Sequence, residues 1–290
     1  MMTTGTNSDP SGCDDHTDGR LDVYALRTAV LRPAGGWTAL DVVGSTGSTN
    51  ADLLAEAGRG APDRSVLIAE EQVRGRGRLD RTWTSRPGAA LTMSVLWRPE
   101  GVPADRLGWL PMLAGVALID AIAELAPDLP AALKWPNDLL AGPSLGKAAG
   151  ILAEMTAVSG GGPGVVLGIG LNVSTPSTDL PWGATSLAAH GLAATRSEVA
   201  TTLLAHLYRR EADWRDAGGD AEASGLRRDY RSRCASLGAR VRVEKPGGDQ
   251  LIGMAEDVDP QGRLLVHPDG GQRVAVAAGD IVHLRPADHP

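Results

Sequence analysis

The stretch Gln72-Val-Arg-Gly-Arg-Gly-Arg-Leu-Asp-Arg-Thr-Trp83 constrains the fold more than any other part of this 290-residue chain. Compact apolar runs flank it at 65–69 and 91–97, and such runs predict buried strands. The stretch between them is polar and rich in glycine, so it is predicted to be a loop. Because this loop joins two buried strands, we expect it to lie inside a folded domain and not in an unstructured tail.

The residues of this loop favour an anionic ligand. Between Arg74 and Arg86 there are five arginines and one acidic residue, whereas the whole chain has a net charge of −7. Gly75 and Gly77 allow the backbone to approach a ligand closely. The guanidinium group of an arginine can bind two oxygens of one phosphate or carboxylate at once. Trp83 offers a flat face on which a purine can stack. A solvated basic loop, or an arginine–glycine contact to nucleic acid, would also fit this composition.

Outside the loop, the apolar pattern predicts both strands and helices. Further strands are expected at 41–43, 133–135, 150–154 and 165–171. One helix is expected from Ser48 or Thr49, because Thr49 and Asp52 form an N-cap signature. A second is expected over 107–125 from its apolar period. A third is expected after Thr195, which forms an N-cap signature with Glu198. Strands and helices do not alternate strictly, which predicts an α+β fold with a mixed sheet.

The pattern of predicted elements changes near Leu237, because only short strands are predicted after it. Short strands are predicted at 241–243, 251–254, 263–267, 273–276 and 281–284, separated in part by turns such as Pro260-Gln-Gly262. This pattern predicts a small β-barrel. The domain boundaries that follow are a disordered tail over 1–20, a larger domain over 21–236 and the C-terminal barrel over 237–290.

Composition narrows the class of protein. An acidic chain with a pI near 5.4 argues against nucleic acid as the main partner. Two cysteines without a CxxC pair favour neither a disulfide framework nor zinc. The purely apolar runs are shorter than the roughly 20 residues of a membrane helix, and residues 1–20 contain no apolar run typical of a signal peptide. We therefore expect a cytoplasmic protein without a membrane partner.

A second polar segment, Lys134-Trp-Pro-Asn-Asp138, follows a predicted strand and turns at its proline. Such a turn would present Lys134, Asn137 and Asp138 at the end of the strand. A lysine neutralises phosphate, an amide can bind an adenine edge and a carboxylate can hold Mg²⁺. A plain β-turn with Trp135 in the core is the structural alternative for each residue taken singly.

Taken together, these motifs resemble those of bacterial biotin–protein ligases. The matching motifs, in the family's order, are Gly-Ser-Thr-Asn at 47–50, Gln72, Gly-Arg-Gly-Arg at 75–78 with Arg81 and Trp83, Lys-Trp-Pro-Asn-Asp at 134–138, Gly146-Lys147 with 150–154, and Gly-Ile-Gly-Leu-Asn at 168–172. The resemblance implies a class II tRNA synthetase-like mixed sheet with helices, followed by an SH3-like barrel. It also implies biotin and ATP as substrates, Mg²⁺ as the cofactor, a biotinyl-adenylate intermediate and the biotin carboxyl carrier domain of acyl-CoA carboxylases as acceptor.

The resemblance assigns roles to the matched residues. Biotin would be bound by Ser48, Thr49, Asn50, Gln72, Arg76, Gly77, Arg78 and Lys147. ATP would be bound by Gly75, Arg81, Trp83, Lys134, Asn137 and Asn172, with the two asparagines at the adenine. Arg78, Lys147, Lys134 and Asp138 would be catalytic, and Asp138 would assist Mg²⁺ or the acceptor lysine.

Structural alternatives and rival functions stay open. Ser48 and Thr49 also suit a helix cap, Asn172 a turn after its strand, and Lys147 a solvated loop. The closest rival enzyme is a lipoate–protein ligase, and a non-enzymatic nucleic-acid binder is the rival from another class. About 20 residues precede the predicted domain, which predicts a monofunctional ligase without a DNA-binding domain, so no DNA partner is expected. The arginine–glycine loop is expected to be mobile when empty and to order over the adenylate.

Overall fold

The computed structural model describes residues 19–78, 81–84, 86–157, 162–245, 248–277 and 279–284. Its larger part is a seven-stranded sheet in the order β1-β2-β5-β9-β8-β7-β6. The strands are β1 (Ala39–Val43), β2 (Ser65–Ala69), β5 (Ala90–Trp97), β6 (Ala131–Lys134), β7 (Asp138–Ala141), β8 (Gly146–Ala157) and β9 (Pro163–Asn172). β1 and β2 are parallel and the other neighbours are antiparallel, so the sheet is mixed.

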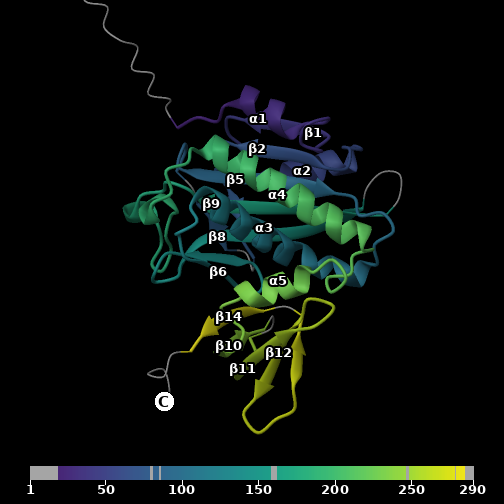
Figure 1. Cartoon of the computed structure of the whole chain (residues 1–290), viewed down its shortest axis with the longest axis vertical. Helices are drawn as coiled ribbons and strands as arrows, with labels where there is room; N and C mark the ends of the chain where they lie inside the picture. The colour runs from purple at the N-terminus through teal and green to yellow at the C-terminus, as the bar shows by residue number, and fades with distance from the viewer. Residues whose placement is uncertain are drawn as a thin grey trace, which may run out of the picture.

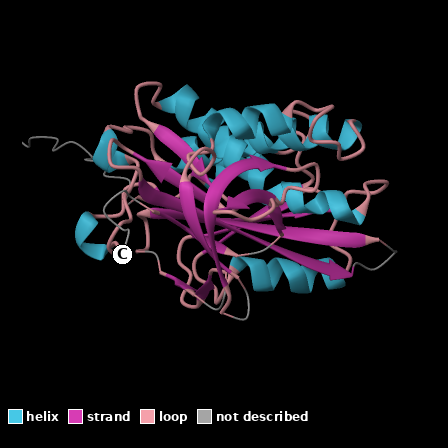
Figure 2. Cartoon of the chain, turned by 90° about the horizontal axis from the view of Figure 1, so that it is seen from below, coloured by secondary structure: helices cyan, strands magenta, loops and turns pink. Residues whose placement is uncertain are grey.

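Helices cover both faces of this sheet (Figure 2). One face carries α3 (Leu110–Leu125) and α4 (Arg196–Asp216), with α1 (Val23–Val30) and α5 (Leu226–Arg233) packed against them. The other face carries α2 (Thr49–Gly58), which packs on β5, β8 and β9. Because both faces are covered, β2 and β5 are buried along their whole length, which explains their continuous apolar runs. Three short 3-10 helices complete this part, η1 (Ala104–Trp109), η2 (Ser177–Asp179) and η3 (Ala188–His190).

The C-terminal part is a five-stranded antiparallel sheet below α5 in Figure 1. Its strand order is β13-β12-β11-β10-β14. The strands are β10 (Arg240–Glu244), β11 (Gln250–Val258), β12 (Leu264–Pro268), β13 (Val274–Val276) and β14 (Asp280–His283). Within the described ranges, no strand pairing between β13 and β14 closes this sheet into a barrel.

Both parts of the molecule share one hydrophobic core. Val241, Val266 and Ile281 of the C-terminal sheet belong to the same buried cluster as α3 and the large sheet. Hydrogen bonds fasten the turn between β11 and β12 to the larger part, because Trp109 Nε1 donates to the Pro260 carbonyl (2.8 Å) and Trp135 Nε1 to the Gly262 carbonyl (3.1 Å). The C-terminal sheet is therefore held in a fixed position beside the large sheet.

The predicted α+β fold, with its mixed sheet and C-terminal strands, is confirmed. The capping box of Thr195 and Glu198 at α4 is also present. The cap of α2 differs from the prediction: Ser48 is the N-cap and its hydroxyl accepts from Ala51 N–H. Thr49 does not cap because its own hydroxyl is bonded to Gln72, and Asp52 accepts from Thr46 instead.

Three other local predictions are corrected. The strand predicted at 133–135 ends at Lys134, and the unpredicted β7 follows to form a hairpin. Lys147, expected in a loop, lies in β8, where it pairs with Leu140 of β7. The arginine–glycine loop contains a small hairpin of β3 (Gly75–Arg76) and β4 (Thr82–Trp83). Its ordering by a ligand stays a prediction.

Residues 104–125, which form η1 and α3, are long and apolar enough to span a membrane. However, 72% of their most apolar stretch is buried inside the protein. Burial at this level identifies α3 as the central core helix. Of the tail predicted over 1–20, residues 1–18 lie outside the described residues. The carbonyl of Gly19 accepts a hydrogen bond from Arg196 Nε (2.9 Å).

Candidate functional site

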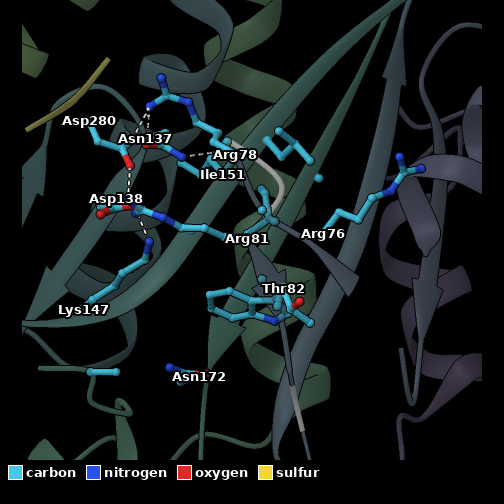
Figure 3. Close-up of a pocket in the computed structure, with 18 of the residues that line it drawn as sticks. Arg76, Arg78, Arg81, Thr82, Asn137, Asp138, Lys147, Ile151, Asn172 and Asp280 are labelled. Carbon is cyan, nitrogen blue, oxygen red and sulfur yellow. Dashed lines mark hydrogen bonds and ion pairs between the residues drawn. The ribbon is translucent and has the colours of Figure 1, made fainter. Parts of the chain in front are cut away.

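A cavity of about 350 Å³ lies where the large sheet meets the C-terminal sheet (Figure 3). Its floor is β8 and β9, and its walls are the start of α2, the β3–β4 hairpin, the β6–β7 turn and β14. Every predicted site residue except Gly75 lines it: Ser48, Thr49, Asn50, Gln72, Arg76, Gly77, Arg78, Arg81, Trp83, Lys134, Asn137, Asp138, Lys147 and Asn172. Gly75 lies in the same hairpin. Predicted residues up to 124 positions apart in the chain, from Ser48 to Asn172, thus line one pocket.

One end of the cavity, the neutral end, is lined by Thr49, Asn50 and Gln72, and the buried Ser94 lies behind them. Gln72 Oε1 accepts from the backbone N–H of Thr49 (2.7 Å) and from its hydroxyl (3.0 Å). Ser94 Oγ lies 2.7 Å from Thr49 Oγ1 and 2.6 Å from Asn50 Oδ1. These contacts fix the side chains in advance while Gln72 Nε2 keeps donor capacity for a ligand.

The glycines of β9 make room for this end. A Cβ on Gly168 would lie 2.2 Å from Asn50 Oδ1, and one on Gly170 would lie 2.4 Å from the Trp83 ring. Asn50 also donates to the Leu152 carbonyl (3.2 Å) and to Glu154 (2.8 Å). The Gly-Ile-Gly pattern at 168–170 is therefore a packing requirement of the two side chains that lie on it.

Trp83 lies flat against the floor of the cavity. Its ring packs on Gly170 and is 3.5 Å from the position of a Cβ on Gly150. Its Nε1–H is buried and has no hydrogen-bond partner among the described residues. An unpaired indole donor at a cavity wall is a group that a bound ligand could satisfy.

The opposite end of the cavity, the charged end, contains Arg78, Arg81, Lys134, Asp138, Lys147 and Asp280 (Figure 3). Lys147 Nζ lies 2.7 Å from Asp138 Oδ1. Arg81 Nη2 lies 2.5 Å from Asp280 Oδ2 and Arg78 Nη1 lies 3.5 Å from Asp280 Oδ1. Two carboxylates thus face four cations, which leaves a positive excess suited to an anionic ligand.

Arg78 is positioned by neighbours from both sheets. Its Nη1 donates to Asn137 Oδ1 (3.0 Å) and its Nη2 to the Gly279 carbonyl (3.1 Å). Asn137 is itself fixed because its Nδ2 donates to the Ile151 carbonyl (2.7 Å). Burial lowers the pKa of the Arg78 guanidinium, and the nearby Asp280 and Asp138 oppose that shift.

Lys134 differs from the other cations of the charged end. No carboxylate of the described residues lies within ion-pair distance of its ammonium group. Burial lowers the pKa of Lys134; Asp138 opposes this effect and Lys147 adds to it. A partly buried ammonium group without a carboxylate partner among the described residues is held at a cost, which a bound anion would relieve.

Three predicted residues have partners or directions that differ from the ligand contacts implied by the family resemblance. The side chain of Arg76 is exposed and points away from the charged end (Figure 3). Asn172 donates to the Thr185 carbonyl (3.1 Å), as expected for an asparagine that satisfies a turn. Asn137 uses its amide to hold Arg78.

The contributions of the C-terminal sheet and of Ser94 to the site were not predicted from the sequence. Asp280, Glu244, Ile281 and Val282 line the cavity from β14 and β10. An Asp between glycine and an apolar strand carries no signal of a distant partner in the sequence. Ser94 has apolar neighbours on a fully buried strand. A polar residue at a buried position needs a hydrogen-bond partner, and this was the signal in the sequence that could have indicated its role.

The described residues do not offer a ready-made metal site. No group of three or more potential metal ligands occurs among them. The carboxylates that line the cavity, Asp138, Asp280 and Glu244, each lie within 4 Å of a cation from Lys147, Arg81 or Arg242. Assignment of Mg²⁺ to Asp138 alone therefore does not fit the donor set.

This chain is similar to known proteins in both sequence and structure. A model of the Biotin/lipoate A/B protein ligase family matches residues 45–172, and a model of the Biotin protein ligase C terminal domain matches residues 236–284. The biotin–[acetyl-CoA-carboxylase] ligase of Mycobacterium tuberculosis is 47% identical over 269 residues, 91% of this chain and 96% of that protein. The bifunctional ligase/repressor BirA of Escherichia coli is 32% identical over 81% of this chain and 70% of its own length.

A similar solved structure is that of a biotin protein ligase from Aquifex aeolicus in complex with biotin and ATP. Its TM-score is 0.70 at 24% identity, and the match covers 86% of this chain and 100% of that one. At this identity the likeness concerns the fold alone.

Proposed function

This chain belongs to the biotin/lipoate A/B protein ligase family, and we propose that it uses ATP to join biotin to a lysine of an acceptor protein. The product would be an amide formed through biotinyl-5′-AMP. The observation that supports this function best is a single cavity with a neutral, hydrogen-bonding end and a cationic end. A ligand with an uncharged polar head and a carboxylate tail fits that arrangement.

The neutral end favours biotin over lipoate. Thr49, Asn50 and Gln72 present amide and hydroxyl groups, and a ureido ring offers both donors and an acceptor to them. The dithiolane ring of lipoate offers no comparable groups and would leave buried polar atoms unpaired. A site built around hydrogen bonds rejects such an analogue strongly.

The charged end supports the first chemical step. A carboxylate oxygen of biotin attacks the α-phosphorus of ATP, the bond to the β-phosphate oxygen breaks, and pyrophosphate leaves. Arg78 and Lys147 would stabilise the negative charge that develops between carboxylate and α-phosphate, while Lys134 and Arg81 would bind the other phosphate oxygens. Because the nucleophile belongs to the substrate, the residues contribute position and charge.

In the second step the amine of the acceptor lysine attacks the acyl carbon of the adenylate. The bond from that carbon to the phosphate oxygen breaks, and AMP leaves with the electron pair. The attacking amine must lose a proton, and we propose Asp138 as its acceptor. Its carboxylate lines the cavity and is oriented by the ion pair with Lys147.

We assign Mg²⁺ to the ATP phosphates and not to a cage of side chains. Mg²⁺ commonly keeps several waters and is held by substrate phosphates with one or two carboxylates. It would neutralise phosphate charge when bound. Asp138 is the carboxylate that the large sheet contributes to the charged end, but its partner Lys147 would have to move first.

We propose a biotin carboxyl carrier domain as the acceptor, since the M. tuberculosis relative is named for acetyl-CoA carboxylase. We place the reaction in the cytoplasm, and the buried free thiol of Cys234 fits a reducing compartment. We propose that residues 21–236 and residues 237–290 form two domains. A nucleic-acid binder is disfavoured because the described cations of the charged end line a cavity and three of them face carboxylates.

The deciding experiment is incubation of the chain with biotin, ATP and Mg²⁺, with and without a biotin carboxyl carrier domain. Mass spectrometry should show the acceptor heavier by one biotinyl group, and pyrophosphate should appear only when biotin is present. Lipoate in place of biotin is the matched control. Transfer of lipoate but not biotin, or steeply salt-dependent DNA binding without biotin-dependent pyrophosphate, would reverse the assignment.

A further inference from the structure

The outer face of the C-terminal sheet carries apolar side chains that the core does not use. Ile252 is 42% exposed, Met254 40% and Val282 37%. These are three of the eight large hydrophobic residues exposed anywhere in the described part of the chain. Exposed apolar residues gathered on one sheet face differ from singly scattered ones, because together they mark an interaction surface.

Strand register places these three residues on the same face. Arg242 of β10 pairs with Val282 of β14 on one side and with Ile252 of β11 on the other. Two residues along β10, Arg240 pairs with Met254. Directly paired residues of antiparallel strands point to the same side, whereas the alternate residues Val241 and Val243 are buried in the core. We call the set Arg240, Arg242, Ile252, Met254 and Val282 the outer face.

The outer face is continuous with the mouth of the cavity. The next pair in the register is Glu244 with Asp280, and both line the cavity together with Val282. Moving along the sheet from the charged end, one therefore meets Asp280 and Glu244, then the row of Val282, Arg242 and Ile252, then Met254. A molecule lying on the outer face would have its edge at the charged end.

Arg242 adds a charge to this apolar surface. Its Nε is buried without a hydrogen-bond partner among the described residues, and its nearest carboxylate, Glu244, lies 3.6 Å away. An incoming carboxylate at this position would gain a charge-assisted hydrogen bond. The partner that suits the face is thus a folded surface with apolar side chains and at least one acidic residue.

The second chemical step requires such a partner. A lysine reaches the adenylate only through its four-carbon side chain, so the backbone of the acceptor must lie at the mouth of the cavity. The outer face is a described surface that combines this position with exposed apolar area. We infer that the outer face of the C-terminal sheet is the docking surface for the acceptor domain during transfer of biotin. This inference rests on the proposed function, because it names the surface that receives the same acceptor.

The test separates docking from adenylate chemistry. The double variant Ile252→Ser/Met254→Ser changes two exposed residues that do not line the cavity. Enzyme loaded with biotinyl-adenylate is mixed with increasing concentrations of a biotin carboxyl carrier domain, and single-turnover transfer is followed by mass spectrometry. In parallel, hydroxylamine, a small amine that needs no docking, consumes the same adenylate.

The acceptor concentration at half-saturation should rise about tenfold in the double variant, as when central contact residues of an interface are truncated. Adenylate formation and its reaction with hydroxylamine should stay as in the unmodified chain. Arg242→Glu should raise the same concentration, and the raised value should fall as salt increases because a like-charge repulsion is screened. Tyr24→Ala, an 82% exposed residue on α1 at the opposite end of the molecule (Figure 1), is the matched control and should change nothing.

Unchanged half-saturation in the double variant, with full adenylate formation, would overturn the docking inference and leave the ligase assignment intact. A chain that forms no adenylate from biotin and ATP even without substitutions would instead overturn the proposed function. An equal loss of hydroxylamine and acceptor transfer in the double variant would also count against docking, because it would place the effect in the chemistry.

Discussion

At the neutral end of the cavity every polar group comes from the large sheet and the elements beside it, whereas the charged end also requires Asp280 from the C-terminal sheet. Thr49, Gln72 and Ser94 are bonded to one another and carry no charge. Arg78 and Arg81 instead face a carboxylate that belongs to the other sheet. The neutral end is thus complete before a ligand binds, but the charged end holds ion pairs that phosphate oxygens must replace.

This contrast has a physical basis. Hydrogen bonds among neutral groups can be shared with a ligand at little cost, since each oxygen has two lone pairs. A charge in a partly buried site needs an opposite charge nearby, and Asp138 and Asp280 supply it in the empty protein. The comparison predicts that substitutions at the charged end affect chemistry, and substitutions at the neutral end affect affinity for biotin.

The largest effect is expected for Arg78→Ala. Loss of one preorganised donor at a developing negative charge commonly lowers rates about 10²–10³-fold, and Arg78 bridges Asn137, Gly279 and Asp280. Biotin-dependent pyrophosphate release is the measurement. Arg86→Ala, an exposed arginine of the same segment paired with Asp179, is the control and should be near normal. A near-normal rate for Arg78→Ala would remove its role.

Lys147→Ala should slow adenylation by about 10²-fold, because an ammonium group at the reacting carboxylate is lost. The variant also leaves Asp138 without its cation, so Asp138→Asn is the matched partner. If the pair acts only as a structural tie, both variants will show the same small change in pyrophosphate release. A far larger loss in Lys147→Ala is expected.

At the neutral end, Thr49→Val should raise KM for biotin about 5- to 100-fold and leave kcat nearly unchanged. The hydroxyl is buried between Gln72 and Ser94, and an unpaired buried polar group costs about 1–3 kcal/mol. Steady-state kinetics with varied biotin will check this split. Thr92→Val is the control, since Thr92 is equally buried on β5 and bonded to the Ala69 carbonyl outside the cavity.

Asp280→Asn should have a smaller effect and the opposite sign. Partly exposed ion pairs contribute about 1 kcal/mol or less, so removal of the competing carboxylate should lower KM for ATP by a few-fold and more so at low salt. Fluorescence or kinetic titration with ATP is suitable. A rise in KM for ATP would mean that Asp280 positions the arginines and does not compete with phosphate.

The smallest effect is a change in pH dependence. Burial holds the pKa of Lys134 below 10.5, so its ammonium is present at neutral pH and is lost on the alkaline side earlier than that of an ordinary lysine. kcat/KM for ATP, which reports the free enzyme, should therefore begin to fall at a lower pH than it would with an ordinary lysine at this position. In Lys134→Arg, whose guanidinium stays charged, that fall should move to higher pH; an unchanged profile would assign it to another group.

Much of the site was predictable from the sequence, because its charged and polar residues occur in short motifs whose residue types indicate their chemistry. Arg78, Lys134, Asp138 and Lys147 were predicted together from their motifs, and all line one cavity. Local errors arose where a tertiary partner outcompeted a local one. Thr49 bonds Gln72 and leaves the cap to Ser48, and Arg76 points away although its motif is intact. The short helices α1 and α5 were missed, since α5 buries only Leu226 and Tyr230.

The sequence by itself determined the longer strands and helices, the family to which the chain belongs and the cations of the site, because apolar period and side-chain chemistry are local properties. Only the tertiary structure decided that Asp280 faces Arg78 and Arg81 across about 200 positions, and that Ile252 and Val282 share one face beside the cavity. Those facts follow from strand register and from how one sheet packs on another, which no short stretch of sequence encodes.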